Sequence, residues 1–245
     1  WLGGEEFINS VERWCLWLGD CPPATLRTMP KVMARVQAVR AFRAASKSLP
    51  TQAIAATPTR FHTEFLPSHE FIALPQVSSE RRETIPIAFL APKALCGDKL
   101  RVIEHAQLWH FGVMLSKMHM AWTRATCGRL KSDYQYSVLI VYNNFPWPQA
   151  PTDKQKQAIE DAAQAVLDAR AKFPNASLAD LYDPLAMPEA LTKAHQKLDA
   201  AVDSAYAKRK FTGDSDRVAF LFELYQQITS PLESKKATRR KRAKT

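Results

Sequence analysis

The chain has 245 residues, 46% of them hydrophobic, which is enough for one large domain or two small ones with a buried core. No apolar run approaches the roughly 18 residues of a membrane span, and the first residues show neither an initiator Met nor a signal peptide. We therefore expect a soluble piece of a longer chain. Only seven glycines occur, none in a glycine-rich loop, which excludes Rossmann and P-loop nucleotide sites.

The net charge of +10 is unevenly distributed. Residues 235–244 hold seven Lys and Arg and no acid, whereas residues 151–234 hold 10 bases against 13 acids. Residues 1–150 hold 17 bases against 11 acids, so the basic surface is expected in the first half. Four cysteines without a Cys-x-x-Cys pair argue against a zinc site or a disulfide framework and favour the reducing cytoplasm.

Helix and strand patterns alternate in the first half of the chain. Apolar residues at helical spacing predict a helix from Met29, and short apolar runs predict strands at Phe71–Val77 and Ile85–Leu90. A second helix is expected over His105–Ala125. The β-branched and aromatic run Arg129–Tyr142 predicts one long strand.

Three prolines within residues 146–151 interrupt this pattern and predict an extended connector. Beyond it the chain is expected to be helical: 154–172 after an N-cap at Thr152-Asp153, 188–207, and 216–228 after an Asp214 cap. We expect an α/β domain over residues 1–146, with a mixed sheet and flanking helices. An all-α domain should follow over 147–232, then a disordered basic tail over 233–245.

Signals for catalysis are weak. The six histidines show no His-x-x-x-His spacing and no ligand cluster, so no metal site is expected. Adenine methyltransferases hold the target amine with an Asn/Asp-Pro-Pro-aromatic loop. The nearest string here, Asn143–Pro148, has a different order and is better explained as a structural corner.

The most informative segment is the polar start of the predicted strand at 129–142. Strand alternation would place Arg129, Lys131, Asp133 and Gln135 on one face, before the run enters a core at residues 138–141. Such groups suit base-edge readout, since Lys donates to guanine, Asp accepts from cytosine and Gln pairs with adenine. An ordinary solvated sheet face with a Lys131–Asp133 ion pair is the simpler interpretation of the pattern alone.

Two further polar clusters lie between predicted elements. Residues 78–83 combine two serines with Arg81 and Arg82, which suit a phosphate clamp, although Glu80 and Glu83 would equally neutralise both arginines. Residues 96–99 form a predicted turn that carries an acid and a base, a combination that is usually just solvated.

Several strings together resemble the MmeI-like adenine-specific DNA methyltransferases, which include combined restriction-modification enzymes. The resemblance covers nearly the whole chain except its tail. The matching strings are Phe7–Ser10 with Arg13–Leu18, Val39–Arg43, Val77–Arg82 with Ile85–Ile87, Ser116–His119 with Trp122, Gly128–Tyr134, Tyr142–Pro148, Leu178–Pro184 with Met187–Pro188, and Leu198–Asp203.

The resemblance implies the target-recognition domain and the C-terminal helical domain of such an enzyme, without its catalytic domain. It implies double-stranded DNA and the methyltransferase domain of the same polypeptide as partners. S-adenosylmethionine would bind in the parent enzyme and not in this piece, which carries no catalytic residue of its own.

The resemblance also favours base readout by the polar strand, because family members read bases from this strand and from two loops before it. Lys131 and Asp133 would read a G·C pair, with guanine facing Lys131. The other implied base-reading residues are Gln135, Asp98, Lys99 and Gln76. The candidate phosphate contacts are Ser79, Arg81, Arg82, Lys117 and Arg129.

The predicted function is therefore sequence-specific DNA recognition for adenine N6-methylation by a domain outside this chain. The alternative is a protein-interaction module whose basic tail alone holds nucleic acid nonspecifically. Deletion of residues 235–245 distinguishes the two, because sequence preference would survive only if the folded part recognises DNA.

Overall fold

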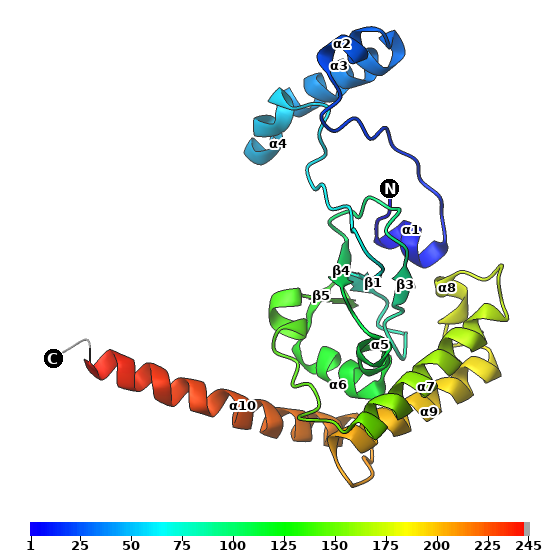
Figure 1. Ribbon diagram of the computed structural model, residues 1–245, viewed down its shortest axis with the longest axis vertical. Helices are drawn as coiled ribbons and strands as arrows, with labels where there is room; N and C mark the ends of the chain where they lie inside the picture. The colour runs from blue at the N-terminus through cyan, green and yellow to red at the C-terminus, as the bar shows by residue number, and fades with distance from the viewer. Residues whose placement is uncertain (243–245) are drawn as a thin grey trace.

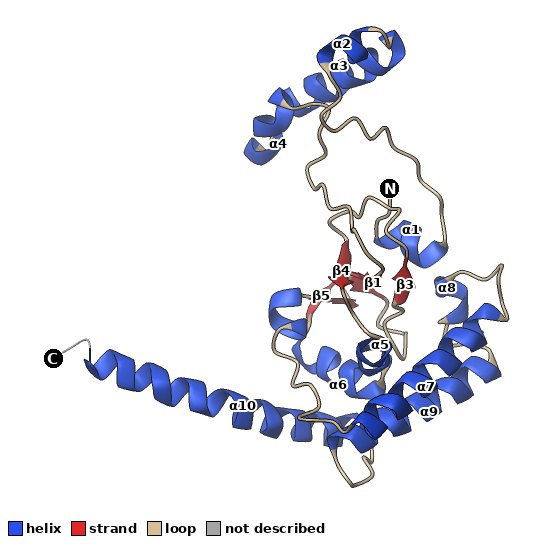
Figure 2. Ribbon diagram, viewed as in Figure 1, coloured by secondary structure: helices blue, strands red, loops and turns tan. Residues whose placement is uncertain are grey.

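A computed structural model describes residues 1–242 of the chain (Figure 1). It consists of a small helical arm, a central body with two short sheets, a layer of paired helices, and one long helix that projects from the body. Strands occupy only the centre, while helices form the arm and the C-terminal half (Figure 2). The expected α/β fold followed by a helical region is confirmed.

Two three-stranded antiparallel sheets take the place of the single mixed sheet that we expected. The first has the order β3 (Ala88–Leu90), β1 (Phe71–Pro75), β4 (Leu100–Glu104). The second has the order β2 (Val77–Ser78), β6 (Asp133–Gln135), β5 (Gly128–Leu130). Because only Gln76 separates β1 from β2, one chain segment contributes a strand to both sheets.

The sheets pack against helices from both halves of the chain. The first half contains α1 (Gly4–Asn9), α5 (Leu108–Leu115), α6 (Lys117–Thr126) and a π-helix, η2 (Val138–Tyr142). The second half contains α7 (Asp153–Ala171), α8 (Leu178–Leu181), α9 (Glu189–Tyr206) and α10 (Asp214–Arg242). In Figure 1, α7 and α9 run side by side next to α5.

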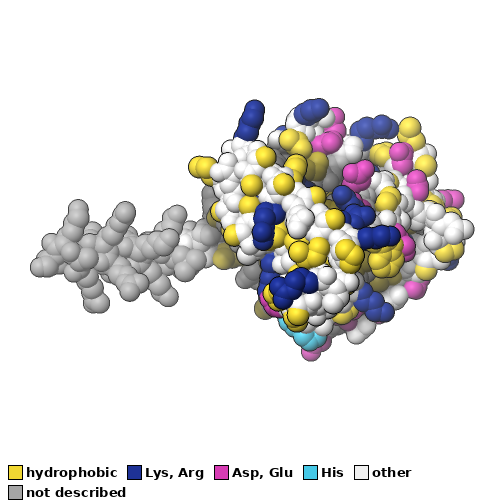
Figure 3. Space-filling model, turned by 90° about the horizontal axis from the view of Figure 1, so that it is seen from above, with side chains coloured by type: hydrophobic (Ala, Val, Ile, Leu, Met, Phe, Trp, Pro, Cys, Tyr) yellow, Lys and Arg dark blue, Asp and Glu magenta, His cyan; other side chains and the backbone are white. Residues whose placement is uncertain are grey.

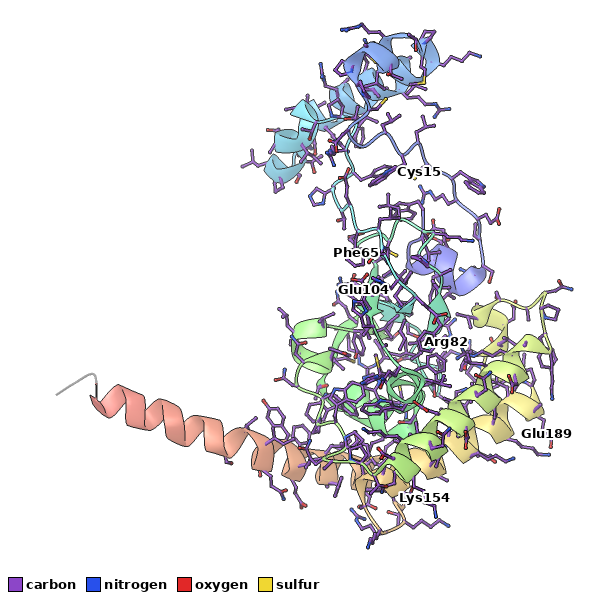
Figure 4. The ribbon with its side chains drawn as sticks, viewed as in Figure 1. Cys15, Phe65, Arg82, Glu104, Lys154 and Glu189 are labelled. Atoms are coloured by element: carbon purple, nitrogen blue, oxygen red, sulfur yellow. The ribbon has the colours of Figure 1, made fainter. Side chains whose placement is uncertain are left out.

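The arm is built from α2 (Pro23–Arg27), α3 (Pro30–Ala44), α4 (Leu49–Ala53) and the 3-10 helix η1 (Ile54–Ala56). It stands away from the body on two extended segments, which Figure 4 marks at Cys15 and Phe65. The helix expected from Met29 is confirmed as α3, with Met29 as its N-cap.

Some predicted elements are shorter or divided. The helix expected over His105–Ala125 is two helices, because Ser116 is extended (φ −80°, ψ 163°) and its hydroxyl accepts a hydrogen bond from the His119 amide as a new N-cap. The strand expected at Ile85–Leu90 begins only at Ala88. The strand β4 was not predicted.

The helices of the second half agree with the sequence patterns. The Thr152 hydroxyl caps α7 by accepting from the Gln155 amide, and Pro188 precedes α9. Helix α10 continues through Arg242, so its backbone is helical where residues 233–242 were expected to be disordered, while residues 243–245 lie outside the described residues. The domain boundaries stay a prediction. No helix in residues 1–242 has both the length and the apolarity that a membrane span requires.

One hydrophobic core joins the two halves of the chain. It includes Ile72 and Ile87 near the sheets, Phe111 on α5, and Ile159 and Leu198 on α7 and α9. Helix α5 approaches the α7/α9 pair at Gly112, where an added Cβ would lie 2.6 Å from Cγ2 of Ile159. The absence of a side chain at this position therefore sets the spacing between the halves.

Gly112→Ala should destabilise the protein although alanine favours helix. The new methyl group would overlap a branched side chain that cannot move away freely, and such overpacking costs about 1–3 kcal/mol. Chemical denaturation measures the free energy of unfolding. Gly213→Ala is the matched control because nothing lies within 4 Å of its added Cβ. Gly213 precedes α10, where alanine is a poorer N-cap than glycine, so a loss smaller than that of Gly112→Ala is expected. Equal stability of the two variants would refute this account of the α5 packing.

A second contact between the halves is ionisable. The Lys117 amide at the start of α6 donates to Oδ1 of Asp199 on α9 at 2.7 Å. Burial raises the pKa of the Asp199 carboxyl to about 6, although the hydrogen bond from Lys117 opposes the shift. The native state therefore holds a proton on Asp199 between about pH 4 and pH 6, where the unfolded chain releases it.

The free energy of unfolding should consequently fall as pH rises from 4 to 6, by up to about 3 kcal/mol from this group. Asp199→Asn should remove this part of the decline, because its amide oxygen still accepts from Lys117 and does not titrate. Denaturation at several pH values tests this. Asp216 should affect the pH dependence of the unfolding free energy in the opposite direction. Hydrogen bonding to Arg209 lowers the Asp216 pKa to about 2, so the stabilisation that this carboxylate contributes is lost as pH falls, and Asp216→Asn should remove that loss. Parallel pH profiles for the Asp199 variant and the parent would contradict the assignment.

Candidate nucleic-acid interface

The polar segment at 129–142 is a β-hairpin followed by a π-helix, and the prediction of one long strand was wrong. Strands β5 and β6 pair Arg129 with Tyr134 and Leu130 with Asp133, so Lys131 and Ser132 form the turn. Lys131 has a left-handed φ of +56°, and the Arg129 guanidinium donates to the Ser132 carbonyl at 3.0 Å. A left-handed residue ends a strand, which alternation in the sequence cannot reveal.

The hairpin places its polar side chains differently from a flat strand face. Lys131 is exposed at the tip, while Asp133 and Gln135 are half-buried on β6 and alternate with buried Tyr134 and Tyr136. No ion pair joins Lys131 to Asp133 among the residues that the structure describes. The simpler interpretation required a Lys131–Asp133 ion pair. Since that pair is not formed, the neighbouring carboxylate does not neutralise the Lys131 charge.

Contacts within the hairpin and with helix α6 fix its position. The Arg129 guanidinium lies 4.1 Å from the centroid of the Tyr134 ring. The Tyr134 hydroxyl accepts from Nε of Arg124 at 3.3 Å, and the Tyr136 hydroxyl lies 3.0 Å from Nε2 of His119. Burial lowers the His119 pKa to about 4, so this imidazole is neutral at physiological pH.

The run after Ser137 does not enter the core as a strand. Val138, Leu139 and Ile140 lie on η2 and are exposed, Leu139 by 75%, whereas Val141 is fully buried. The Trp122 indole donates to the Val141 carbonyl at 3.0 Å. A π-helical turn thus replaces the expected buried strand.

The loop at 78–83 contacts the hairpin directly. The Glu80 amide donates to Oδ1 of Asp133 at 3.3 Å, and the Ser79 hydroxyl accepts from the Arg81 amide at the same distance. Arg81 is exposed, whereas Arg82 is half-buried and burial lowers its pKa. Figure 4 labels Arg82 on the central body.

The alternative interpretation of this loop was that Glu80 and Glu83 neutralise Arg81 and Arg82. No such salt bridge is formed among the described residues. Glu83 instead lies 3.8 Å from Arg124 on α6. Arg81 therefore has no acidic partner within the described part of the chain, which leaves its charge available to a phosphate.

Backbone hydrogen bonds bring the other candidate base-reading residues beside the hairpin. The Gln76 amide donates to the Lys99 carbonyl at 2.9 Å, and the Gln76 carbonyl accepts from the Tyr136 amide at 2.7 Å. Val77 is the register partner of Gln135. Asp98 and Lys99 form a 3.4 Å ion pair with both side chains about two-thirds exposed, at 64% and 65%. Segments far apart in sequence thus form one continuous surface.

Other candidates lie elsewhere, and one nearby residue was missed. Lys117 begins α6 at the contact with α9, away from the turn of the hairpin. Arg101 on β4 is a diagonal neighbour of Gln76, and the Arg101 Nε and Gln76 Oε1 atoms are buried without hydrogen-bond partners among the described residues. Arg101 was missed because β4 was not predicted. The adjacent β-branched residues Val102 and Ile103 were its only signal.

Lys131→Gly should remove the cation at the tip without disrupting the hairpin, because glycine adopts φ near +56° without the steric penalty of a side chain. The melting temperature should stay within a few degrees of the parent's. Lys131→Val is the matched control and should be clearly less stable, because a β-branched residue is disfavoured there. A similar loss in both variants would show that the Lys131 side chain itself supports the turn.

A hairpin with an exposed polar tip and two adjoining loops, on a small α/β body backed by helices, is the geometry of a macromolecular recognition module. Among the residues whose side chains the structure describes, no group of three His, Cys, Asp or Glu is arranged to hold a metal ion. Residues 1–149 match the family model of the MmeI target recognition domain, and residues 151–233 match that of the MmeI C-terminal domain. The chain belongs to the MmeI family.

Relatives of known identity agree with this assignment. The chain is 36% identical over 228 residues to DNA methyltransferase A of Bacillus subtilis (strain 168), covering 93% of this chain and 26% of the relative. It also matches the solved structure of the Type IIL restriction-modification enzyme MmeI in complex with DNA. That match has a TM-score of 0.89 and 47% sequence identity, and covers 94% of this chain and 30% of MmeI. The chain thus spans less than a third of either relative's length.

Proposed function

We propose that this chain recognises a specific double-stranded DNA sequence on behalf of an adenine-specific DNA methyltransferase of the restriction-modification type. The catalytic domain belongs to the same polypeptide outside this chain and binds S-adenosylmethionine there. This piece positions the DNA and has no catalytic residue of its own. The four cysteines are free thiols, which supports a reducing compartment such as the cytoplasm.

The observation that carries the proposal is the hairpin with Lys131 at its tip and Asp133 two residues further on. A two-stranded β-ribbon fits the major groove of B-DNA, which is about 12 Å wide. Lys131 donates to guanine O6 and N7, while the Asp133 carboxylate accepts from the cytosine N4 amine. A cation and a carboxylate offered side by side match a G·C pair, because guanine presents two adjacent acceptors to the lysine and cytosine presents a donor to the carboxylate.

The neighbouring segments extend the readout. Gln135 contacts the base next to the G·C pair from the same strand. Asp98 and Lys99 read further bases from the loop before β4, which the Gln76 backbone connects to the hairpin. Gln76 is a weaker candidate because its Oε1 atom is buried. Ser79 and Arg81 hold a phosphate from the loop that contacts Asp133, with Arg82, Lys117 and Arg129 as weaker candidates because each is half-buried or engaged in contacts within the protein.

Exchanging the charges tests the proposal in the full-length enzyme. Lys131→Glu combined with Asp133→Arg should change the preferred base pair at one position of the recognition site, because donor and acceptor trade places. Wrong pairs at such a position cost about 1–3 kcal/mol, or roughly 5- to 150-fold in affinity. Sequencing of methylated adenines in expressing cells identifies the recognition site before and after the exchange.

Asp133→Asn is the matched control. It keeps an oxygen acceptor for the Glu80 amide and so preserves the loop, but it no longer presents a carboxylate to cytosine. Discrimination at the same position should weaken without a new preference. An unchanged recognition site in the double variant would remove Lys131 and Asp133 from the readout.

A further inference from the structure

The arm has an unusual charge composition. Residues 21–63 contain seven Lys and Arg and no Asp or Glu. Residues 235–244 contain seven more bases, so the remaining residues, 1–20, 64–234 and 245, hold 20 bases against 24 acids, a net charge of −4. The positive excess of the chain is therefore confined to the arm and the C-terminal tail, while the base-reading hairpin stands on a net negative body.

Two of the seven cations hold the arm together. The Arg43 guanidinium donates to the carbonyls of Ile54, Thr57 and Arg60 at 3.1, 3.0 and 2.7 Å, which ties α3 to η1 and the segment after it. Arg60 pairs with Glu64 at 2.8 Å and also with Asp20. The two acids at the base of the arm are thus both engaged by Arg60.

The other five cations, Arg27, Lys31, Arg35, Arg40 and Lys47, are exposed. None forms an ion pair within the part of the chain that the structure describes. Looking down on the arm, Figure 3 shows Lys and Arg side chains spread over the near surface, with most Asp and Glu to one side. Like charges held on one small lobe repel each other, so an anionic surface that covers them lowers their electrostatic free energy.

We propose that the arm is a second DNA-binding element, which contacts the phosphate backbone of the duplex whose bases the hairpin reads. This inference rests on the proposed function. Helix α3 has 15 residues and is about 22 Å long. Duplex DNA carries one negative charge per about 1.7 Å of its axis, so several phosphates lie within reach of a helix of this length. Figure 1 shows that two extended segments hold the arm away from the body, so its exposed cations are not covered by the rest of the chain.

The test removes three of the exposed charges in the full-length enzyme, as Lys31→Gln, Arg35→Gln and Arg40→Gln. Glutamine retains good helix propensity, and none of the three residues holds the arm together. Affinity for a cognate and a scrambled duplex is measured over a range of salt concentrations. Both affinities should fall together, and the slope of log K against log salt should decrease by about 0.9 per lost contact, or close to 3 in all. The methylated sequence should not change.

Two controls accompany this variant. Lys154→Gln, Lys172→Gln and Lys197→Gln remove the same net charge from exposed, unpaired positions in the described helical half, and should change the slope by less than one unit. The exchange Lys31→Arg, Arg35→Lys and Arg40→Lys keeps every charge and should bind like the parent. If the glutamine variant has a lower melting temperature, the charge-keeping variant separates lost charge from lost fold.

An unchanged salt slope in the glutamine variant would overturn the arm as a phosphate contact, and equal effects of both triple glutamine variants would show a general charge effect. If the glutamine variant lost affinity for the cognate duplex but not for the scrambled one, and the methylated sequence changed, the arm would read bases. That result would also refute a phosphate contact. Failure of the proposed function looks different, because the parent enzyme itself would then bind cognate and scrambled duplexes equally.

Discussion

The recognition surface depends on one backbone position, Gln76. Its amide joins the β1/β4 sheet at Lys99, and its carbonyl joins the hairpin at Tyr136. A residue with one partner on each side has little freedom to shift without breaking a hydrogen bond. The loop at 96–99, the β1–β2 segment and the hairpin therefore move as one unit, and three segments separated by tens of residues keep a fixed spacing relative to the bases that they would contact.

That surface also needs a rigid support. Arg124 on α6 contacts the Tyr134 hydroxyl, the Glu83 carbonyl and Asp214 at the start of α10, so one guanidinium connects the hairpin, the loop at 78–83 and the helical half. His119 supports Tyr136 as a neutral imidazole, which does not change its hydrogen bonding near neutral pH. Recognition geometry within a fraction of an ångström requires such packing behind the contacting side chains. The helical half thus supports the position of the hairpin and of the loop at 78–83.

Local signals in the sequence predicted most helices and the candidate residues, but not the shape of the site. The Thr152 cap and the proline before α9 are short-range features, and the corresponding helices formed where expected. The hairpin was missed because its turn depends on a lysine in a left-handed conformation, which no composition rule favours. The division at Ser116 and the strand β4 depend on packing between distant segments. The likeness in sequence identified residues 131, 133 and 135 as a group, whereas only the structure placed the first of them at a tip.

Under the proposed function, base reading and charge occupy different parts of this molecule, and the physics of DNA recognition explains why that arrangement is useful. A carboxylate such as Asp133 is repelled by the phosphates on either side of the groove, so it needs cations nearby to offset the repulsion. Cations packed beside it would pair with it and cancel its value as an acceptor for cytosine. An arm with its own uncompensated charge attracts the duplex from a distance at which it forms no ion pair with Asp133. Lys131 at the hairpin tip and Asp133 on β6 then form no ion pair with each other, and under the proposed function this leaves each of them able to distinguish one base from another.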